Sequence, residues 1–526
     1  MKRTYCLFIQ FYLSILITFV FLGVCSCFIG KASANIYKSR INAQWSGDNS
    51  HFWYRNDLAK GHREFVLVDM TKGMRRLAFD HKKMAASLSN IGKVQLEAGK
   101  LPLEGLKFDL EKSTVSFRAL GRFFLCDLKT HELTKIEQPK KLPKEKKSGT
   151  KNPRNNKEAR PKPYRPSREI SPDGNWRAFI RNHNVFVRAR EGEEEIQLSE
   201  DGKDGNSYQT PYWSPNSKNL FAFRVQPGAV GDVHLIESSP RDGGRANLRT
   251  RRYALPGDKF TAHELNRFDV EKKTQTKPEV GLIDFRGPRL RWTQDGRYFR
   301  YQKIDRGHQR LRIIEVDTFT GKFRNIIDEI SETFIWTEHP KDLGVPLINW
   351  LDETNEIIYL SEKDGWRHLY LIDVKTGKTK NQITRGKFVV RYVDRIDKEN
   401  RQIWFRASGL NKGQDPYLMH YYRVNFDGSG FTALTGGNGW HNISYSPDRK
   451  YIIDQYSRVD MAPVNELRRV SDGSLVCELE KSDITDLEAS GWKSPEVFRA
   501  NGRDGKTGIW GIIARPKDFD PKKKYP

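Results

Sequence analysis

The stretch SPDGNWRAFIRNHNVFVRA, Ser171 to Ala189, contains the pattern that decides the fold. It opens on a Ser-Pro-Asp-Gly turn, in which proline presets φ and glycine allows a positive φ. The run from Arg177 to Ile180 follows the turn with the composition of a short, half-buried β-strand. A second strand-like run then leads to another polar turn. The pattern therefore predicts a β-hairpin that begins at a tight, sequence-encoded turn.

The same pattern recurs along the chain in units of about 40 to 60 residues. Clear copies are YWSPNSKNLFAFRV (212–225), RWTQDGRYFRYQKI (291–304), NWLDETNEIIYLSE (349–362), VDRIDKENRQIWFRAS (393–408) and SYSPDRKYIIDQYS (444–457). Weaker copies are QWSGDNSHFWYRND (44–57) and LKFDLEKSTVSFRAL (106–120). Thr-Gly-Lys and Asp-Gly turns within the units provide the positive-φ positions that tight hairpins need.

Each unit reads as one four-stranded antiparallel sheet. Eight such units in succession predict an all-β fold, an eight-bladed β-propeller over residues 40–500, in which each sheet packs against its neighbours. Tandem β-sandwiches are the alternative, but the regular spacing of the turns favours the propeller. The unit that begins at Tyr212 is longer than the others because it carries an excursion at residues 238–260.

The composition supports a β-rich protein with a basic excess. Aromatic residues reach 12%, and 91 Lys and Arg oppose 66 Asp and Glu, for a formal net charge of +25. Much of the excess lies at residues 138–168, a segment rich in Pro, Asn and Ser, which we interpret as a solvated linker or surface loop. Binding of nucleic acid by this segment is disfavoured by the export signal at the N-terminus.

Residues 1–34 form that signal: Lys2 and Arg3 precede a long apolar run, and Ala32-Ser33-Ala34 resembles a cleavage site. The run is long enough to act instead as an uncleaved membrane anchor. Lipid attachment at Cys25 or Cys27 is a third option. We expect an exported protein, periplasmic or extracellular, which contacts a membrane only if the segment stays uncleaved.

Cys126 and Cys477 are the cysteines outside the signal. They could form a disulfide in an oxidising compartment if the fold brings them together, or remain two separate thiols.

No catalytic motif stands in the 526 residues. A Gly-x-Ser-x-Gly nucleophile turn is absent, as is a phosphate-binding loop. His131-Glu132 and His263-Glu264 begin the zinc-peptidase pattern but lack its second histidine. We therefore predict no metal, no cofactor and no catalytic residue in this chain, and no activity for the chain alone.

Four stretches together resemble the N-terminal region of dipeptidyl peptidase IV-like serine peptidases, in the prolyl oligopeptidase family. They are PYWSPNSKNLFAFRV (211–225), HLIESSPRDGG (234–244), SEKDGWRHLYLIDVKTGKTKNQITRGKFVV (361–390) and PKDFDPKKKYP (516–526). The resemblance implies an eight-bladed propeller that covers a C-terminal α/β-hydrolase domain, with the substrate between them. It also implies that residues 501–526 are the hinge into a hydrolase domain that this chain does not contain.

The family's exopeptidases hold the substrate's free amine with paired glutamates that precede the Trp-Ser-Pro turn. The corresponding stretch here, LSEDGKDGNSYQTPYWSP (198–215), has no such pair. The resemblance leaves Glu200, Asp201 and Asp204 as the acids that could replace it, because an ammonium needs one or two nearby carboxylates. An acidic turn facing water is the alternative interpretation.

The sequence thus favours the substrate-gating region of an exported serine peptidase, with a peptide as its substrate and a homodimer as an open expectation. A non-catalytic exported propeller that binds a peptide, glycan or envelope component is the alternative, since a propeller fold does not fix function.

Overall fold

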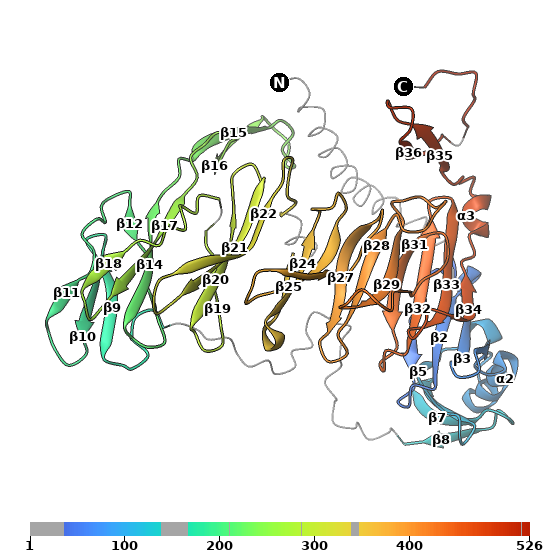
Figure 1. The fold of residues 1–526 in the computed structure, drawn as a ribbon. Coiled ribbons are helices and arrows are strands. Elements are labelled where there is room, and N and C mark those ends of the chain that lie inside the picture. Colours follow the sequence, from blue (N-terminus) through green and yellow to red (C-terminus); the bar gives the residue numbers. More distant parts are fainter. Residues whose placement is uncertain are drawn as a thin grey trace. The chain divides into compact units, whose positions relative to one another are not determined.

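The structure is a computed structural model that describes residues 36–137, 167–209, 211–285, 287–337, 347–516 and 518–525. The expected signal at 1–34 and nearly all of the basic segment 138–168 lie outside the described residues. Within them the fold is all-β, as the repeats predict, and every strand pairing is antiparallel (Figure 1). The described helices of α type are α2 (His81–Gly92) and α3 (Thr485–Ala489).

The chain divides into two compact units, and in the described residues each unit carries four larger β-sheets and one two-stranded hairpin. Unit 1 comprises the described parts of residues 1–151, together with 387–425 and 429–525. Its sheets have four strands each, in chain order: β1 (Gln44–Trp45), β2 (His51–Asp57), β3 (Arg63–Asp69) and β4 (Met74–Leu77); β5 (Glu104–Asp109), β6 (Thr114–Ala119), β7 (Arg122–Asp127) and β8 (Leu133–Ile136); β27 (Val389–Asp397), β28 (Gln402–Ser408), β29 (Met419–Asn425) and β30 (Thr432–Ala433); β31 (Trp440–Tyr445), β32 (Tyr451–Arg458), β33 (Met461–Arg469) and β34 (Leu475–Lys481).

Unit 2 comprises the described parts of residues 152–386, with 426–428. Its sheets are β9 (Trp176–Arg181), β10 (Asn184–Ala189) and β11 (Glu195–Gln197); β12 (Ser207–Tyr208), β13 (Tyr212–Trp213), β14 (Asn219–Gln226), β17 (Ala262–Asp269) and β18 (Thr274–Thr276); β19 (Arg291–Trp292), β20 (Tyr298–Ile304), β21 (Arg310–Asp317) and β22 (Phe323–Ile330); β23 (Ile348–Leu351), β24 (Glu356–Ser361), β25 (His368–Asp373) and β26 (Thr379–Gln382).

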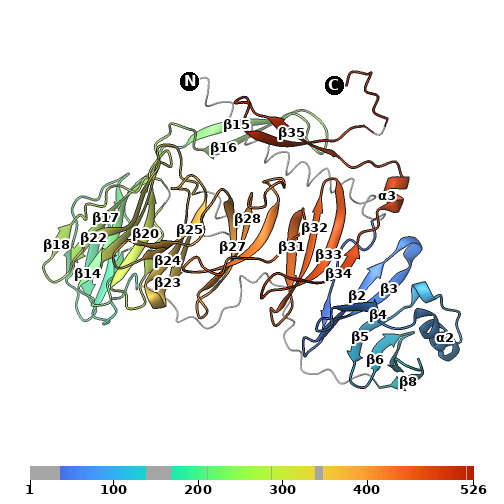
Figure 2. The ribbon, with the colours of Figure 1, turned by 45° about the vertical axis from the view of Figure 1, so that its right-hand side comes forward.

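Two hairpins stand apart from these sheets. The excursion predicted at 238–260 forms part of the hairpin of β15 (Gly231–Glu237) and β16 (Asn247–Tyr253), inserted between β14 and β17. Near the C-terminus, β35 (Glu496–Asn501) pairs with β36 (Gly508–Ile513), so the boundary expected at 500/501 falls inside a strand (Figure 2). Residues 514–516 and 518–525 contain no strand.

The repeated turn owes its shape to one side-chain pattern. The Ser171 hydroxyl donates to Asp173 Oδ1 at 2.5 Å and accepts the amide N–H of Trp176 at 2.9 Å. The turn is thus closed by a side chain that competes with the backbone for its hydrogen bonds. The same two bonds recur in the turns at Ser214, Thr293 and Ser446. The motif therefore has a common physical basis in these four copies.

In unit 1, sheets from the two ends of the chain pack against each other. Residues of β2 and β3 share a core with β32–β34, in which Phe52, Val68 and Leu467 are each 0% exposed. Hydrogen bonds join the same sheets, from Tyr54 Oη to Glu480 Oε1 at 2.9 Å, and Figures 1 and 2 both show β2 and β3 beside β34. The opposite side of the first sheet contributes Phe65 to a second core with α2 and β5–β7.

In unit 2, the sheet of β12–β14, β17 and β18 is likewise covered on both faces. Trp213, Leu220 and Phe268 pack against β9 and β10, whereas Phe221 and Leu265 pack against β19–β21. A two-sheet sandwich would leave one face of each sheet to water. Burial of both faces instead agrees with the side-by-side packing expected of propeller blades, and Trp213 and Trp292 belong to these cores.

Cys126, on β7, is buried and Cys477, on β34, is half-buried, and both are free thiols. The disulfide left open by the sequence is therefore absent between these two described residues. Burial raises the pKa of the Cys126 thiol to about 11, which leaves it protonated and unreactive at neutral pH.

Candidate functional site

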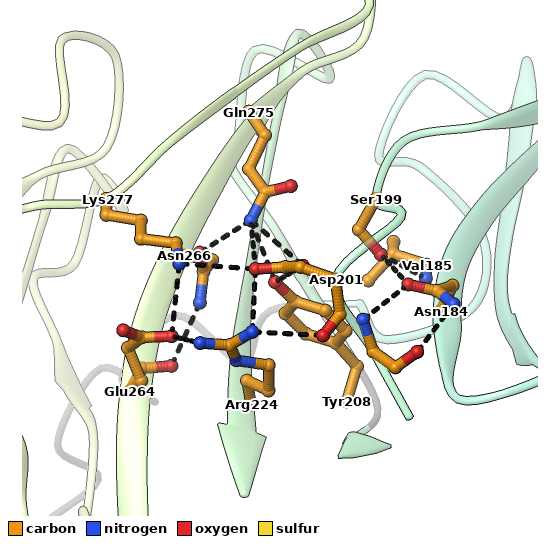
Figure 3. A network of polar contacts seen from close by, with 11 residues as sticks. Asn184, Val185, Ser199, Asp201, Tyr208, Arg224, Glu264, Asn266, Gln275 and Lys277 are labelled. Carbon is orange, nitrogen blue, oxygen red and sulfur yellow. Dashed lines mark hydrogen bonds and ion pairs between the residues drawn. The ribbon is translucent and has the colours of Figure 1, made fainter. Parts of the chain in front are cut away.

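The loop between β11 and β12 carries the acids predicted to bind an amine, and β10 anchors it (Figure 3). Asn184 accepts the Gly202 N–H at 2.8 Å and donates to the Gly202 carbonyl at 3.1 Å. The Ser199 hydroxyl donates to Asn184 Oδ1 at 3.0 Å. Gly202 is required here, because a Cβ would lie 2.1 Å from the His183 carbonyl oxygen. These contacts hold Asp201 in one position.

Asp201 turns its carboxylate toward the neighbouring sheet. It accepts the Tyr208 hydroxyl at 2.8 Å and a guanidinium N–H of Arg224 at 2.8 Å, and the Lys277 ammonium lies 3.2 Å away. Burial acts to raise the pKa of Asp201, but the bonds from Tyr208 and Lys277 and the charge of Arg224 outweigh it and hold the pKa below its usual value. The carboxylate is thus ionised at neutral pH.

Glu264 places a second carboxylate beside the first. It lies on β17 directly opposite Arg224 on β14, and Arg224 Nη2 is 2.5 Å from its Oε2. The same oxygen lies 3.6 Å from Lys277 Nζ. Figure 3 shows Asp201 and Glu264 on either side of the two cations. The site therefore already holds a primary ammonium between two carboxylates.

The two cations differ in their freedom. The Arg224 side chain is 16% exposed and also donates to the Asp201 main-chain carbonyl at 3.0 Å, so it is part of the framework. The Lys277 side chain is 46% exposed, and its ammonium lies 3.2 Å from the Asp201 carboxylate and 3.6 Å from that of Glu264. Exposed pairs of this kind contribute about 0.2–1 kcal/mol. An incoming ammonium could therefore replace that of Lys277 at small cost.

Of the three acids named from the sequence, the structure brings only Asp201 into this network. Glu200 and Asp204 are exposed on the same loop and take no part in the contacts of Figure 3. Sequence reasoning considered Glu264 only as half of a zinc motif and missed Arg224 and Lys277. Glu264 could have been found from the pairing of β14 with β17, which sets it opposite Arg224. The inserted β15–β16 hairpin separates these two strands in the sequence, so their pairing cannot be recognised there.

The described ranges contain no group of three or more His, Cys, Asp and Glu arranged to hold a metal ion. In the same ranges, no helix combines the length and the apolar character that crossing a bilayer demands.

Comparison with known proteins identifies the family. The family model described as "Dipeptidyl peptidase IV (DPP IV) N-terminal region" matches residues 111–463, more than half of the chain. The chain belongs to this family. The Asp201 network and the repeated turns from Ser171 to Ser446 all lie inside the matched range.

Similar curated proteins carry related names. A probable dipeptidyl-aminopeptidase B of Aspergillus oryzae is 22% identical over 396 residues, which are 68% of this chain and 43% of that protein. Human dipeptidyl peptidase 8 is 25% identical over 291 residues, 45% of this chain and 32% of its own length. The chain thus spans less than half of the length of these relatives. Among solved structures, a dipeptidyl peptidase 4 of Porphyromonas gingivalis superposes over 93% of this chain and 66% of its own chain. The sequence identity is 16% and the TM-score is 0.44.

Proposed function

We propose that this chain is the substrate-gating region of an exported serine peptidase of the dipeptidyl peptidase IV-like group, and that it acts in proteolysis together with an α/β-hydrolase domain. The family match over 111–463 carries the proposal. Packing of β2 and β3 against β32–β34 in unit 1, and of neighbouring sheets on both faces of one sheet in unit 2, supports blade-like packing within each unit. A propeller built from such blades would restrict entry of folded proteins and exclude water from the catalytic site.

Within this function, the Asp201 network is the site for the substrate's amine. Two carboxylates share one exchangeable ammonium, that of Lys277, and Arg224 holds both in place. A peptide's α-ammonium would exchange with Lys277 and leave the network's charge unchanged. Glu200 and Asp204, the other acids proposed for this role, would attract the amine toward the loop from its exposed side.

The proposal is tested with the full chain together with its hydrolase domain. The coding sequence beyond the codon for Pro526 is read for a Gly-x-Ser-x-Gly segment, and the encoded domain is produced with this chain. Hydrolysis of a chromogenic dipeptidyl substrate with a free amine is then compared with that of its N-acetylated form. We expect activity with the first, and only when both parts are present. Hydrolysis that is equally fast without this chain would refute the gating role.

Site variants separate amine binding from structure. Asp201→Asn and Glu264→Gln should raise KM for the free-amine substrate and leave the acetylated substrate unaffected, because only the ammonium needs the carboxylates. Lys277→Met should lower KM, since it removes the competing ammonium. Lys218→Met is the matched control, because Lys218 is also an exposed lysine in an ion pair, with Glu271. Unchanged KM in both carboxylate variants would remove the amine site.

Export is supported by the leader-like composition of residues 1–34. Determination of the N-terminal residue of the protein secreted by a bacterial host tests it: Asn35 is expected after cleavage, and an intact Met1 in the membrane fraction would indicate an anchor. The homodimer stays a prediction.

A further inference from the structure

A pocket of about 450 Å³ lies in unit 1, between the sheet of β27–β30 and the sheet of β31–β34. This volume is within the range of about 300–1,000 Å³ that is typical of small-ligand sites. The pocket takes residues from five strands, β27, β28, β29, β31 and β32, so its walls belong to regular structure on both sides. The amine network lies in unit 2, and the two sites share no residue.

Aromatic side chains form much of the wall. Tyr392 and Tyr421 line the pocket from β27 and β29, and Trp440 lines it from β31. Tyr421 is 7% exposed, whereas Trp440 is 48% exposed although it is one of the largest apolar side chains in the chain. An indole that stands half in water at the edge of a pocket offers a flat apolar face to a ligand.

Neutral polar groups complete the lining. Asn442 and the pair Gln455 and Ser457 contribute two amides and a hydroxyl from β31 and β32. Each amide carries both a donor and an acceptor, and a hydroxyl can serve as either. The Gln455 amide nitrogen already donates to the Ser39 carbonyl, which leaves its oxygen and its second N–H for a ligand. Such groups match a ligand whose own polar groups are both donors and acceptors.

The charged and ionisable groups of the wall already have partners within the protein. The Arg406 guanidinium stacks 4.0 Å from the centre of the Tyr392 ring and binds Asp394 at 2.8 Å. His441 lies 2.8 Å from Asp454, and both of these side chains are fully buried. An anion or a cation entering the pocket would therefore find its partner charge neutralised, which favours an uncharged ligand.

We propose that this pocket binds a neutral saccharide. A sugar ring presents one face of C–H groups, which would stack on Trp440, and a rim of hydroxyl groups, which would exchange hydrogen bonds with Asn442, Gln455 and Ser457. The inference does not depend on the peptidase function, because it rests on unit 1 alone.

The test measures binding of a defined panel to the full chain by saturation-transfer NMR and by titration of tryptophan fluorescence. The panel holds glucose, galactose, mannose, N-acetylglucosamine, maltose and cellobiose, with a hexuronate and an uncharged proline-rich peptide as competing classes. At least one neutral sugar should bind with a dissociation constant on the order of 1 mM or lower, a typical strength for a small polar ligand site. Trp440→Ala should weaken it by about tenfold or more, because the stacking surface is lost.

Controls separate binding from folding. Trp366→Ala removes another exposed tryptophan, 39% exposed in the turn between β24 and β25 in unit 2, and should leave the affinity unchanged. Asn442→Ala, an exposed position on β31, should weaken sugar binding by several-fold while circular dichroism stays that of the unchanged chain. The proposal is overturned if no neutral sugar binds, if Trp440→Ala binds as well as the original chain, or if the hexuronate or the peptide is preferred.

Discussion

The hydrogen bonds of Asp201 predict how strongly each cation holds the loop between β11 and β12. Arg224 reaches the Asp201 carboxylate at 2.8 Å with a side chain that is 16% exposed, whereas Lys277 reaches it at 3.2 Å with a side chain that is 46% exposed. A hydrogen bond to a charged partner in the first setting contributes about 1.5–3 kcal/mol. The exposed ion pair contributes about 0.2–1 kcal/mol.

The two couplings can be measured separately by double-mutant cycles with Asp201→Asn, Arg224→Gln and Lys277→Gln. Because a chain with two compact units need not unfold in one step, local opening is the appropriate quantity. Hydrogen exchange, read by mass spectrometry on peptides spanning residues 198–209, reports it through amides such as Gly202 N–H, which Asn184 accepts at 2.8 Å.

About 1.4 kcal/mol corresponds to a factor of ten in an equilibrium constant. The coupling between Asp201 and Arg224 should therefore appear as an effect on the order of ten- to a hundredfold on the local exchange rate. The coupling between Asp201 and Lys277 should appear as an effect of at most about fivefold. Exchange in the β15–β16 hairpin, which contributes nothing to the network, should stay constant in every variant. Equal couplings for the two cations, or a larger one for Lys277, would refute the assignment of Arg224 to the framework and of Lys277 to the exchangeable position.

Three further predictions concern stability. Gly202→Ala should destabilise the chain by about 1–3 kcal/mol through the clash with a main-chain carbonyl, whereas Gly231→Ala, where a Cβ meets no atom within 4 Å, should change the melting temperature little. Leu467 is 0% exposed in the core that β2 and β3 share with β32–β34, so Leu467→Ala should lower the free energy of unfolding by about 2–5 kcal/mol. Leu475 is 50% exposed on the same sheet, and Leu475→Ala should lower it by less than about 0.5 kcal/mol. Similar melting temperatures for both variants would argue against this packing. Burial raises the pKa of Asp394 to about 6 despite a neighbouring guanidinium, so the folded chain binds this proton more tightly than the unfolded chain does. The protonated Asp394 therefore stabilises the fold fully below the ordinary carboxyl pKa, and this stabilisation is lost as the pH rises through about 6. Melting temperatures between about pH 4 and pH 7 should therefore fall less steeply in Asp394→Asn, and parallel curves would contradict the raised pKa.

The fold was predictable from the sequence to the extent that hydrogen bonding is local. The Ser-x-Asp turn at Ser171 is closed by side chains within five residues of one another, so the letters alone identify it and its copies at Ser214, Thr293 and Ser446. Hairpin strands on either side of such turns follow from the same local pattern. The hairpin of β35 and β36 escaped prediction because its strands are largely exposed and show no alternation.

The candidate site was predictable only in part, because its members are distant in the sequence. Asp201 stood in a stretch that the family resemblance singled out, but its neighbours Glu200 and Asp204 have the same chemistry and are exposed outside the network. Only the anchoring of Gly202 by Asn184 selects among the three. Glu264 joins Asp201 across 63 positions through the pairing of β14 with β17.

By itself, the amino-acid sequence determined the repeating turns, the antiparallel sheets and the family, since each depends on contacts within a few residues or on motifs in order. The tertiary structure alone decided which carboxylates meet one ammonium, that the first and last sheets share a core, and that Trp440 stands at the edge of a pocket. Those features depend on long-range packing of side chains from different sheets, and no local pattern of residues encodes which surfaces will be brought together.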